Sequence, residues 1–206
     1  MRKFVGSSLL VGAAAVGAIA LSATSASAAG TWTVSNGGSF TGTSTSIAFK
    51  DVTTNQPFNC TSSSAPGSAP NGTGLSGTAI ATLSNGTFSG CTGNLGSTGT
   101  ATLSSGNLNA VSYNAATGVT TGTITGLNAT LVIHDLLGTC NAAVSGEVDN
   151  VTYNNNGTLT VTADTTPKLV IATATGSGCA GLINANDVTT FAATYSVSPV
   201  INITSP

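Results

Sequence analysis

The chain has 206 residues, only 5% of them charged, and it carries a single histidine. This composition argues against a nucleic-acid-binding protein, because affinity for phosphate needs clustered Lys and Arg. Anionic membrane surfaces are disfavoured for the same reason. We therefore expect no nucleic-acid partner and a solvent face made of Thr, Ser, Asn and Gly.

Residues 1–28 have the pattern of a secretory signal peptide. Arg2 and Lys3 form a short basic region, residues 4–21 are mostly apolar, and Ala26-Ser-Ala28 is a small-residue cleavage site. The unbroken apolar run is shorter than the roughly 20 residues that a membrane span needs. We expect cleavage near Ala28, no membrane insertion afterwards, and a product that is secreted, extracellular or loosely associated with the cell wall.

The remaining residues, 29–206, are expected to form one secreted domain. Two lysines against six carboxylates leave this part with a net charge of −4. Thr and Val favour extended backbone, Gly and Asn interrupt it, and no stretch shows sustained helical periodicity. The sequence therefore predicts an all-β fold, either a single antiparallel β-sandwich or a partly closed β-barrel.

Alternating residues predict short strands through the first half of this domain. Apolar residues alternate with polar ones at 32–35, around Phe40 and at 47–49. Residues 61–77, which are rich in Pro and Gly, are expected to be a loop. Asn85-Gly86 separates two short apolar runs and predicts a two-residue hairpin turn.

Residues 109–137 hold the clearest β signal of the chain. The turn residues Asn114 to Gly118 predict a hairpin, and residues 127–134 then alternate as in a strand. Leu127, Ala129, Leu131 and Ile133 fall on one face, and Asn128, Thr130 and His134 fall on the other. The strand is therefore expected to have one buried face and one solvated face.

The second half continues with alternation at 158–163, a short strand at 169–171 and a single phase from Phe191 to Ile203. This last run passes through Pro199, which cannot donate a hydrogen bond to a neighbouring strand. We therefore expect the run to lie at a sheet edge or at a bend between two sheets.

Four cysteines lie in the part that would be exported. In an oxidising compartment two disulfides are expected in preference to metal ligation, and the spacings fit no zinc motif. Three connectivities are possible. We favour Cys60 with Cys91 and Cys140 with Cys179, because each bridge would then staple one half of the domain on either side of residues 109–137.

His134, which is followed by Asp135, is the only obvious base at neutral pH. A serine hydrolase would need a partner serine in a strained turn, and no G-x-S-x-G motif occurs. The position of His134 on the polar face predicts an ordinary surface histidine. A secreted hydrolase that uses His134 is therefore the least favoured of the functional hypotheses.

Glu147 and Asp149 project to the same side of a predicted strand. Paired carboxylates can serve glycoside hydrolysis, or a weak calcium site together with Asp135 or Asp164. Nothing in the sequence marks either acid for catalysis.

Two G-x-G-x-x-G matches, which begin at Gly72 and Gly176, lack the strand and helix of a nucleotide site. We therefore predict no catalytic residue, no cofactor and no metal.

Two runs of alternating threonines could act as a binding surface. Thr121, Thr123 and Thr125 form one run, and Thr158, Thr160 and Thr162 form the other. On a strand their hydroxyls would recur roughly every 6.6 Å. Such rows could bind a repetitive glycan or ordered water at ice, and the alternative is an ordinary solvated face.

Several motifs resemble a family of small secreted actinobacterial, Streptomyces-like proteins with four cysteines. The motifs are Phe88-Ser-Gly-Cys91-Thr-Gly, the segment Leu108 to Gly126, Gly178-Cys-Ala-Gly-Leu-Ile-Asn184 and the closing Ile203-Thr-Ser-Pro206. The resemblance implies an exported Gram-positive protein and assigns no site residues. The composition is also similar to that of the antibiotic-binding apoproteins of actinomycetes, which are secreted β-sandwiches with two disulfides.

Three functions follow as hypotheses. The first is a secreted non-catalytic protein whose hydroxyl surface binds envelope glycan, another wall component or further copies of itself. The second is a carrier of a small apolar ligand, in a cavity near Trp32, Tyr113 or Tyr195. The third is the hydrolase that uses His134.

Overall fold

The computed structural model describes residues 31–206, and the predicted signal peptide therefore lies outside the described residues. The all-β prediction is confirmed. None of the helical turns in the described range is long and apolar enough to cross a membrane. The elements are β1 (Trp32–Ser35), β2 (Gly38–Ser44), β3 (Ile47–Asp51), β4 (Gln56–Cys60), β5 (Ser62–Ala69), β6 (Gly72–Leu75), β7 (Ala81–Gly93), η1 (Asn94–Gly96), β8 (Thr98–Asn114), β9 (Val119–Asp135), β10 (Gly138–Asn154), β11 (Thr158–Val161), β12 (Leu169–Thr175), η2 (Ser177–Cys179), β13 (Val188–Ser198) and β14 (Asn202–Thr204).

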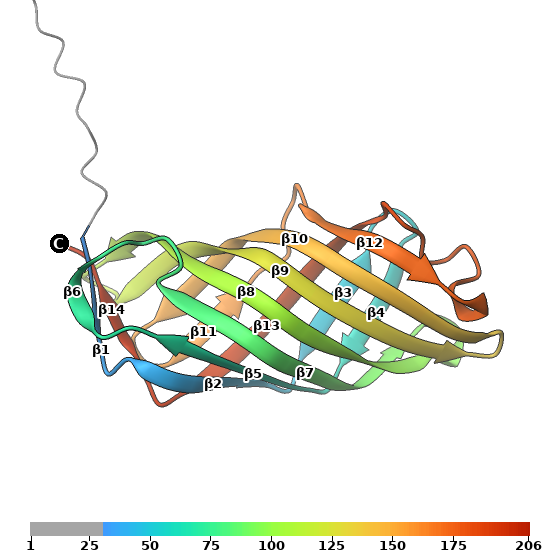
Figure 1. Cartoon of the computed structure of the whole chain (residues 1–206), viewed down its shortest axis with the longest axis horizontal. Coiled ribbons are helices and arrows are strands. Elements are labelled where there is room, and N and C mark those ends of the chain that lie inside the picture. Colours follow the sequence, from blue (N-terminus) through green and yellow to red (C-terminus); the bar gives the residue numbers. More distant parts are fainter. Residues whose placement is uncertain (1–30) are drawn as a thin grey trace, which may run out of the picture.

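Most strands belong to one 11-stranded antiparallel sheet that closes on itself (Figure 1). Three pairs of short strands, β2–β3, β4–β5 and β11–β12, each act as one interrupted strand. Both members of a pair lie along the same neighbour, which is β13, β7 and β10 respectively. The ring is completed by β7 to β10 and by the pairing of β13 with β11 and β12. Of the two predicted architectures, the structure is therefore the barrel, which leaves few unpaired sheet edges.

The interior of the barrel is apolar because alternate residues of each strand point inward. Leu131 and Ile133 are buried as predicted, while Thr130 and His134 on the opposite face are exposed. A cluster of three phenylalanines packs edge to face or tilted, with ring centroids 4.9 Å apart for Phe49–Phe191, 5.3 Å for Phe49–Phe88 and 6.2 Å for Phe88–Phe191. Phe88 is buried and Phe49 and Phe191 are partly buried, and full burial of such a ring stabilises a fold by about 1.5–3 kcal/mol.

A separate three-stranded sheet, in the order β14-β1-β6, covers the barrel end at which β1 begins and the chain ends (Figure 1). We call this the capped end. Trp32 of β1 is only 4% exposed there. The run that continues through Pro199 leaves the barrel as β13 and enters the small sheet as β14, so the predicted bend between two sheets is confirmed.

Both predicted disulfides are present. Cys60–Cys91 joins β4 to β7, and Cys140–Cys179 joins β10 to η2. They close loops with sequence separations of 31 and 39 residues. In the loop-entropy model, closures of this length each stabilise the fold by roughly 3–4 kcal/mol.

Two local predictions were wrong. Residues 61–77 hold β5 and β6, because Ser63, Ala65 and Ala69 fill the buried positions of β5 without the large apolar residues that usually mark a strand. Pro66 is tolerated because the pairing of β5 with β7 shifts register between Ser64 and Gly67.

Asn85-Gly86 lies inside the continuous strand β7 and forms no hairpin turn. Asn85 has φ +52°, so the positive φ that favours Asn before Gly in a turn is used within the strand instead. The turn that joins β7 to β8 lies at residues 94–97 instead, and a second hairpin turn follows β8. There the prediction at residues 114–118 is confirmed, with Gly118 at φ +67° and the Asn114 side chain accepting a hydrogen bond from the Ala116 N–H at 3.0 Å.

Candidate binding groove on the outer wall

The ladder register joins the two predicted threonine runs into bands around the outer wall. Thr121 of β9 pairs with Thr152 of β10, which pairs with Thr160 of β11, which pairs with Thr194 of β13. We call this the first hydroxyl band. A second hydroxyl band crosses seven strands through the paired residues Thr158, Ser196, Thr43, Ser64, Thr87, Thr102 and Thr130.

Much of this wall carries no charge. Residues 52–134, which include β4 to β8 and most of β9, contain no Asp, Glu, Lys or Arg. The hydroxyls bond to one another across strands, as in Thr102 Oγ1 to Thr130 Oγ1 at 2.6 Å and Ser112 Oγ to Thr121 Oγ1 at 2.6 Å. The outer wall is therefore a neutral surface of hydrogen-bonding groups with fixed spacing.

The first band borders a groove of about 520 Å³ between β8, β9, β10 and the segment that follows β11. We call this the band groove. Its lining residues are Val111, Thr121, Gly122, Thr123, Asp149, Asn150, Val151, Thr152, Thr162, Ala163 and Thr165. Its volume falls within the roughly 300–1,000 Å³ of small-molecule sites, although the groove is shallower and more open to solvent than those sites.

The wall is hollow here because the ladders are irregular. β8 shifts register against β9 between Ala110 and Ser112, and β10 shifts against β9 between Val148 and Val151. Gly122 lies between these irregularities, and a Cβ there would lie 2.0 Å from the carbonyl oxygen of Asn109. Glycine is therefore required for the close backbone approach that forms the floor.

Asp164 fixes the bulged part of β10. Its carboxylate accepts hydrogen bonds from the backbone N–H groups of Asp149 and Asn150, both at 3.2 Å, and from Asn150 Nδ2 at 2.8 Å. The Thr162 N–H also donates to the Asn150 carbonyl at 2.9 Å. These bonds hold the strand that lines the groove in one conformation, so its polar groups are preorganised.

Glu147 and Asp149 share one cation. Lys168 Nζ bonds to the Glu147 carboxylate and lies 2.9 Å from Asp149 Oδ2. The hydrogen bonds that Lys168 donates to Glu147, the larger cause, and to Asp149 raise the pKa of Lys168. The two acids do project to one side as predicted, and with Asp164 they outnumber the lysine, so this edge of the groove is acidic.

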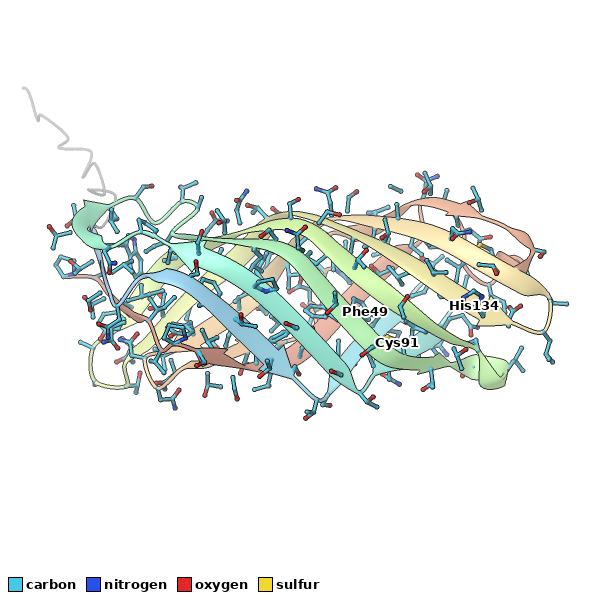
Figure 2. All side chains as sticks on the ribbon, turned by 60° about the horizontal axis from the view of Figure 1, so that its bottom comes forward. Phe49, Cys91 and His134 are labelled. Atoms are coloured by element: carbon cyan, nitrogen blue, oxygen red, sulfur yellow. A yellow bond between two sulfur atoms is a disulfide. The ribbon has the colours of Figure 1, made fainter. Side chains whose placement is uncertain are left out.

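The structure does not bring the other predicted candidates together with the groove. No group of three or more His, Cys, Asp or Glu side chains in residues 31–206 could hold a metal ion. His134 lies toward the barrel end opposite the capped end, where β9 and β10 are joined (Figure 2). Its Nδ1 is 3.0 Å from Thr139 Oγ1. The Asp135 carboxylate is bonded to the N–H groups of its own turn, so it does not orient the histidine.

Small apolar cavities lie along the barrel interior. One of about 80 Å³ lies toward the end with the β9–β10 turn, one of about 60 Å³ lies in the middle beside Tyr195, and one of about 50 Å³ lies toward the capped end. The phenylalanine cluster fills the space between the first two, since Phe49 lines both. Each cavity is smaller than the roughly 300–1,000 Å³ of a drug-sized ligand site.

Of the aromatic residues predicted to surround a ligand, only Tyr195 faces the middle cavity. Its hydroxyl is 3.2 Å from Ser63 Oγ, and burial raises its pKa to about 12. Trp32 is buried in the small sheet instead. Tyr113 lies in β8, near the turn to β9.

No protein-family model, curated protein or solved structure matches this chain. The resemblance to secreted actinobacterial proteins therefore stays a prediction from the quoted motifs.

Sequence reasoning identified the threonine runs but missed the groove between them. The clamp from Asp164 to Asn150 and the glycine floor at Gly122 depend on which residues face each other across strands. One signal was available, because Asp149-Asn150 places two residues that disfavour strands inside a strand-like run. The irregularity of β10 between Val148 and Val151 lies at this pair.

Proposed function

We propose that the protein is a secreted, non-catalytic binding protein that recognises a neutral glycan of the cell envelope in the band groove. The observation that carries this proposal is the meeting of the first hydroxyl band with a preorganised groove of about 520 Å³. Sugars present regularly spaced hydroxyl groups that both donate and accept hydrogen bonds. Threonine hydroxyls, the Asn150 amide oxygen and the remaining acceptor positions of the Asp149 carboxylate, which also binds Lys168, offer the matching groups.

The charge pattern supports a neutral ligand. A polyanion would meet the acidic edge formed by Glu147, Asp149 and Asp164, and it would find only Lys168 as a cation there. Two disulfides in the described range agree with an oxidising compartment outside the cytoplasm. The signal peptide predicted at residues 1–28 supports the same compartment.

The two alternatives have less support. An apolar carrier of a drug-sized ligand would need a larger cavity, since the interior cavities described above hold at most about 80 Å³ each. A hydrolase would need a nucleophile and an orienting acid beside His134, whose ring contacts Thr139 while Asp135 is held by its own turn. Neither alternative uses the groove or the hydroxyl bands.

Binding can be tested by co-sedimentation of the purified mature protein, residues 29–206, with insoluble polysaccharides. Cellulose, chitin and Gram-positive wall stripped of teichoic acid supply three neutral or nearly neutral surfaces. We expect retention on at least one of them and little release by about 0.5 M salt, because hydrogen bonds between neutral groups are weakly screened. Recovery of all the protein in the supernatant with every surface would overturn the proposal.

A pair of matched variants locates the site. Thr121→Val with Thr152→Val removes two hydroxyls of the groove and keeps the β-branched shape. At about 1 kcal/mol for each lost hydrogen bond, affinity should fall roughly 30-fold. Thr87→Val with Thr102→Val removes two hydroxyls of the second band outside the groove and should bind as the wild type does. Equal losses in both variants would show that the groove is not the site.

A further inference from the structure

The barrel end opposite the capped end exposes a group of leucines. Leu136 and Leu137 in the β9–β10 turn are 95% and 64% exposed, and Leu95 in the β7–β8 turn is 81% exposed. We call this the hairpin end (Figure 1). Isolated exposed apolar residues are ordinary, but several gathered at one end mark a contact surface.

Hydrogen bonds fix both turns, so the leucines are presented in defined positions. Asp135 Oδ1 accepts from the Leu137 N–H at 2.7 Å and from the Gly138 N–H at 3.0 Å. In the other turn the Ser97 N–H donates to the Asn94 carbonyl at 3.1 Å. A preorganised apolar group loses little conformational freedom when it binds.

Leu95 adopts an unfavourable backbone conformation. It has φ +56° and ψ +25°, in the left-handed region where Asn or Gly is preferred. In the monomer this leucine is mostly in water, so its side chain gains little there in return for the strained backbone. An apolar residue kept at such a position is better explained by a contact outside the chain.

The same end also has an apolar cavity that can accept an apolar side chain. This is the cavity of about 80 Å³, and its lining includes Phe58, Leu95, Leu182 and Ile183. Projecting leucines and an apolar cavity therefore occur on one surface. A surface that holds both is complementary to itself, which is the requirement for a two-fold symmetric dimer.

We propose that two copies of the protein associate head to head through their hairpin ends, with Leu136 and Leu137 of each copy packing against the cavity of the other. Lys50 and Asp135, which have opposite charges, both line the cavity. Lys50 forms no ion pair within residues 31–206, so across a two-fold axis it is free to meet Asp135 of the second copy. The band groove and the chain termini stay outside this contact, so the dimer would present two grooves.

The test is sedimentation velocity on the mature protein from about 1 µM to about 1 mM, a range that covers weak association. The wild type should shift from monomer to dimer as its concentration rises. Leu136→Ser with Leu137→Ser should raise Kd at least about 100-fold, because each leucine is buried twice in a symmetric dimer. Val200→Ser, which changes an exposed apolar residue near the capped end and outside the band groove, should leave Kd unchanged.

Three results would overturn the proposal. The first is a wild type that stays monomeric throughout the range, and the second is a leucine variant that dimerises as strongly as the wild type. The third comes from flotation with phosphatidylcholine vesicles. Leucine-dependent flotation of a protein that stays monomeric would assign the hairpin end to lipid.

Discussion

The two ends of the barrel differ in whether the chain covers their apolar residues. At the capped end the chain covers its own ring with β1, β6 and β14, and Trp32, Ile201 and Ile203 are all buried. At the hairpin end the ring finishes in short turns, and Leu95, Leu136 and Leu137 face the solvent. Apolar residues stabilise the fold at the capped end, and at the hairpin end we propose that they serve association.

The largest expected effect is at the capped end. Trp32→Ala should lower the free energy of unfolding by about 3–5 kcal/mol, because it removes a buried ring and leaves a cavity. Leu136→Ser at the hairpin end should change it by no more than about 0.5 kcal/mol under monomeric conditions. Urea unfolding at low protein concentration measures both values. Similar losses in the two variants would remove the distinction between the ends.

The stability of the hairpin end should depend on the Cys140–Cys179 disulfide. Replacing Cys140 and Cys179 together with alanine is expected to cost roughly 3–4 kcal/mol, since the bridge ties η2 to β10. Hydrogen exchange should then rise first in residues 177–187 and leave β1 and β14 protected. Uniform loss of protection across the barrel would contradict a local role.

Leu95→Asn should raise the stability of the monomer and weaken its self-association. Asparagine tolerates the left-handed conformation, so the monomer should gain about 1 kcal/mol of stability. Self-association should weaken, because an apolar contact is lost. Thermal unfolding measures the expected gain in stability, and sedimentation velocity on the same sample measures the expected loss of association. A variant that is more stable and still dimerises fully would separate Leu95 from the interface.

A smaller effect concerns pH. Asp51 and Asp187 at the hairpin end are 6% and 7% exposed, and Asp51 Oδ2 has no hydrogen-bond partner within the described residues. Burial raises the pKa of Asp51, and the neighbouring Asp187 carboxyl adds to the rise against hydrogen bonds from Thr54. A carboxyl whose folded pKa lies above its unfolded value stabilises the fold in acid, and this contribution is lost as pH rises through the folded pKa.

Unfolding free energy should therefore fall as pH is raised from about 4 toward neutrality. Asp51→Asn keeps the shape of the side chain and cannot ionise, so it should flatten this dependence. A slope unchanged by Asp51→Asn would place the titrating group elsewhere.

The sequence predicted those features that depend on local pattern and covalent chemistry. The alternation from Leu127 to Ile133 identified the buried face of β9, and the half-by-half grouping of cysteines gave the correct pairing. The proline at 199 marked the change of sheet. In each case the decisive information lies within a few neighbouring residues or in the cysteine spacing.

Features that depend on pairing across the chain could not be predicted. Asn85-Gly86 has the chemistry of a turn, but its partners in β5 and β8 turn it into an irregularity within β7. The β5 strand lacks large apolar residues because its neighbours supply the bulk of the core. The band groove likewise exists only because irregularities in β8 and β10 lie on either side of Gly122.

The central claim, that the band groove binds a neutral glycan, is tested most directly by chemical-shift mapping of the isotope-labelled mature protein. The probe is a soluble oligosaccharide from whichever polysaccharide retains the protein. We predict shifts confined to the amides of residues 121–123, 149–152 and 162–165. Shifts confined to inward-facing residues such as Phe49 and Leu159, or no shifts at saturating oligosaccharide, would contradict it.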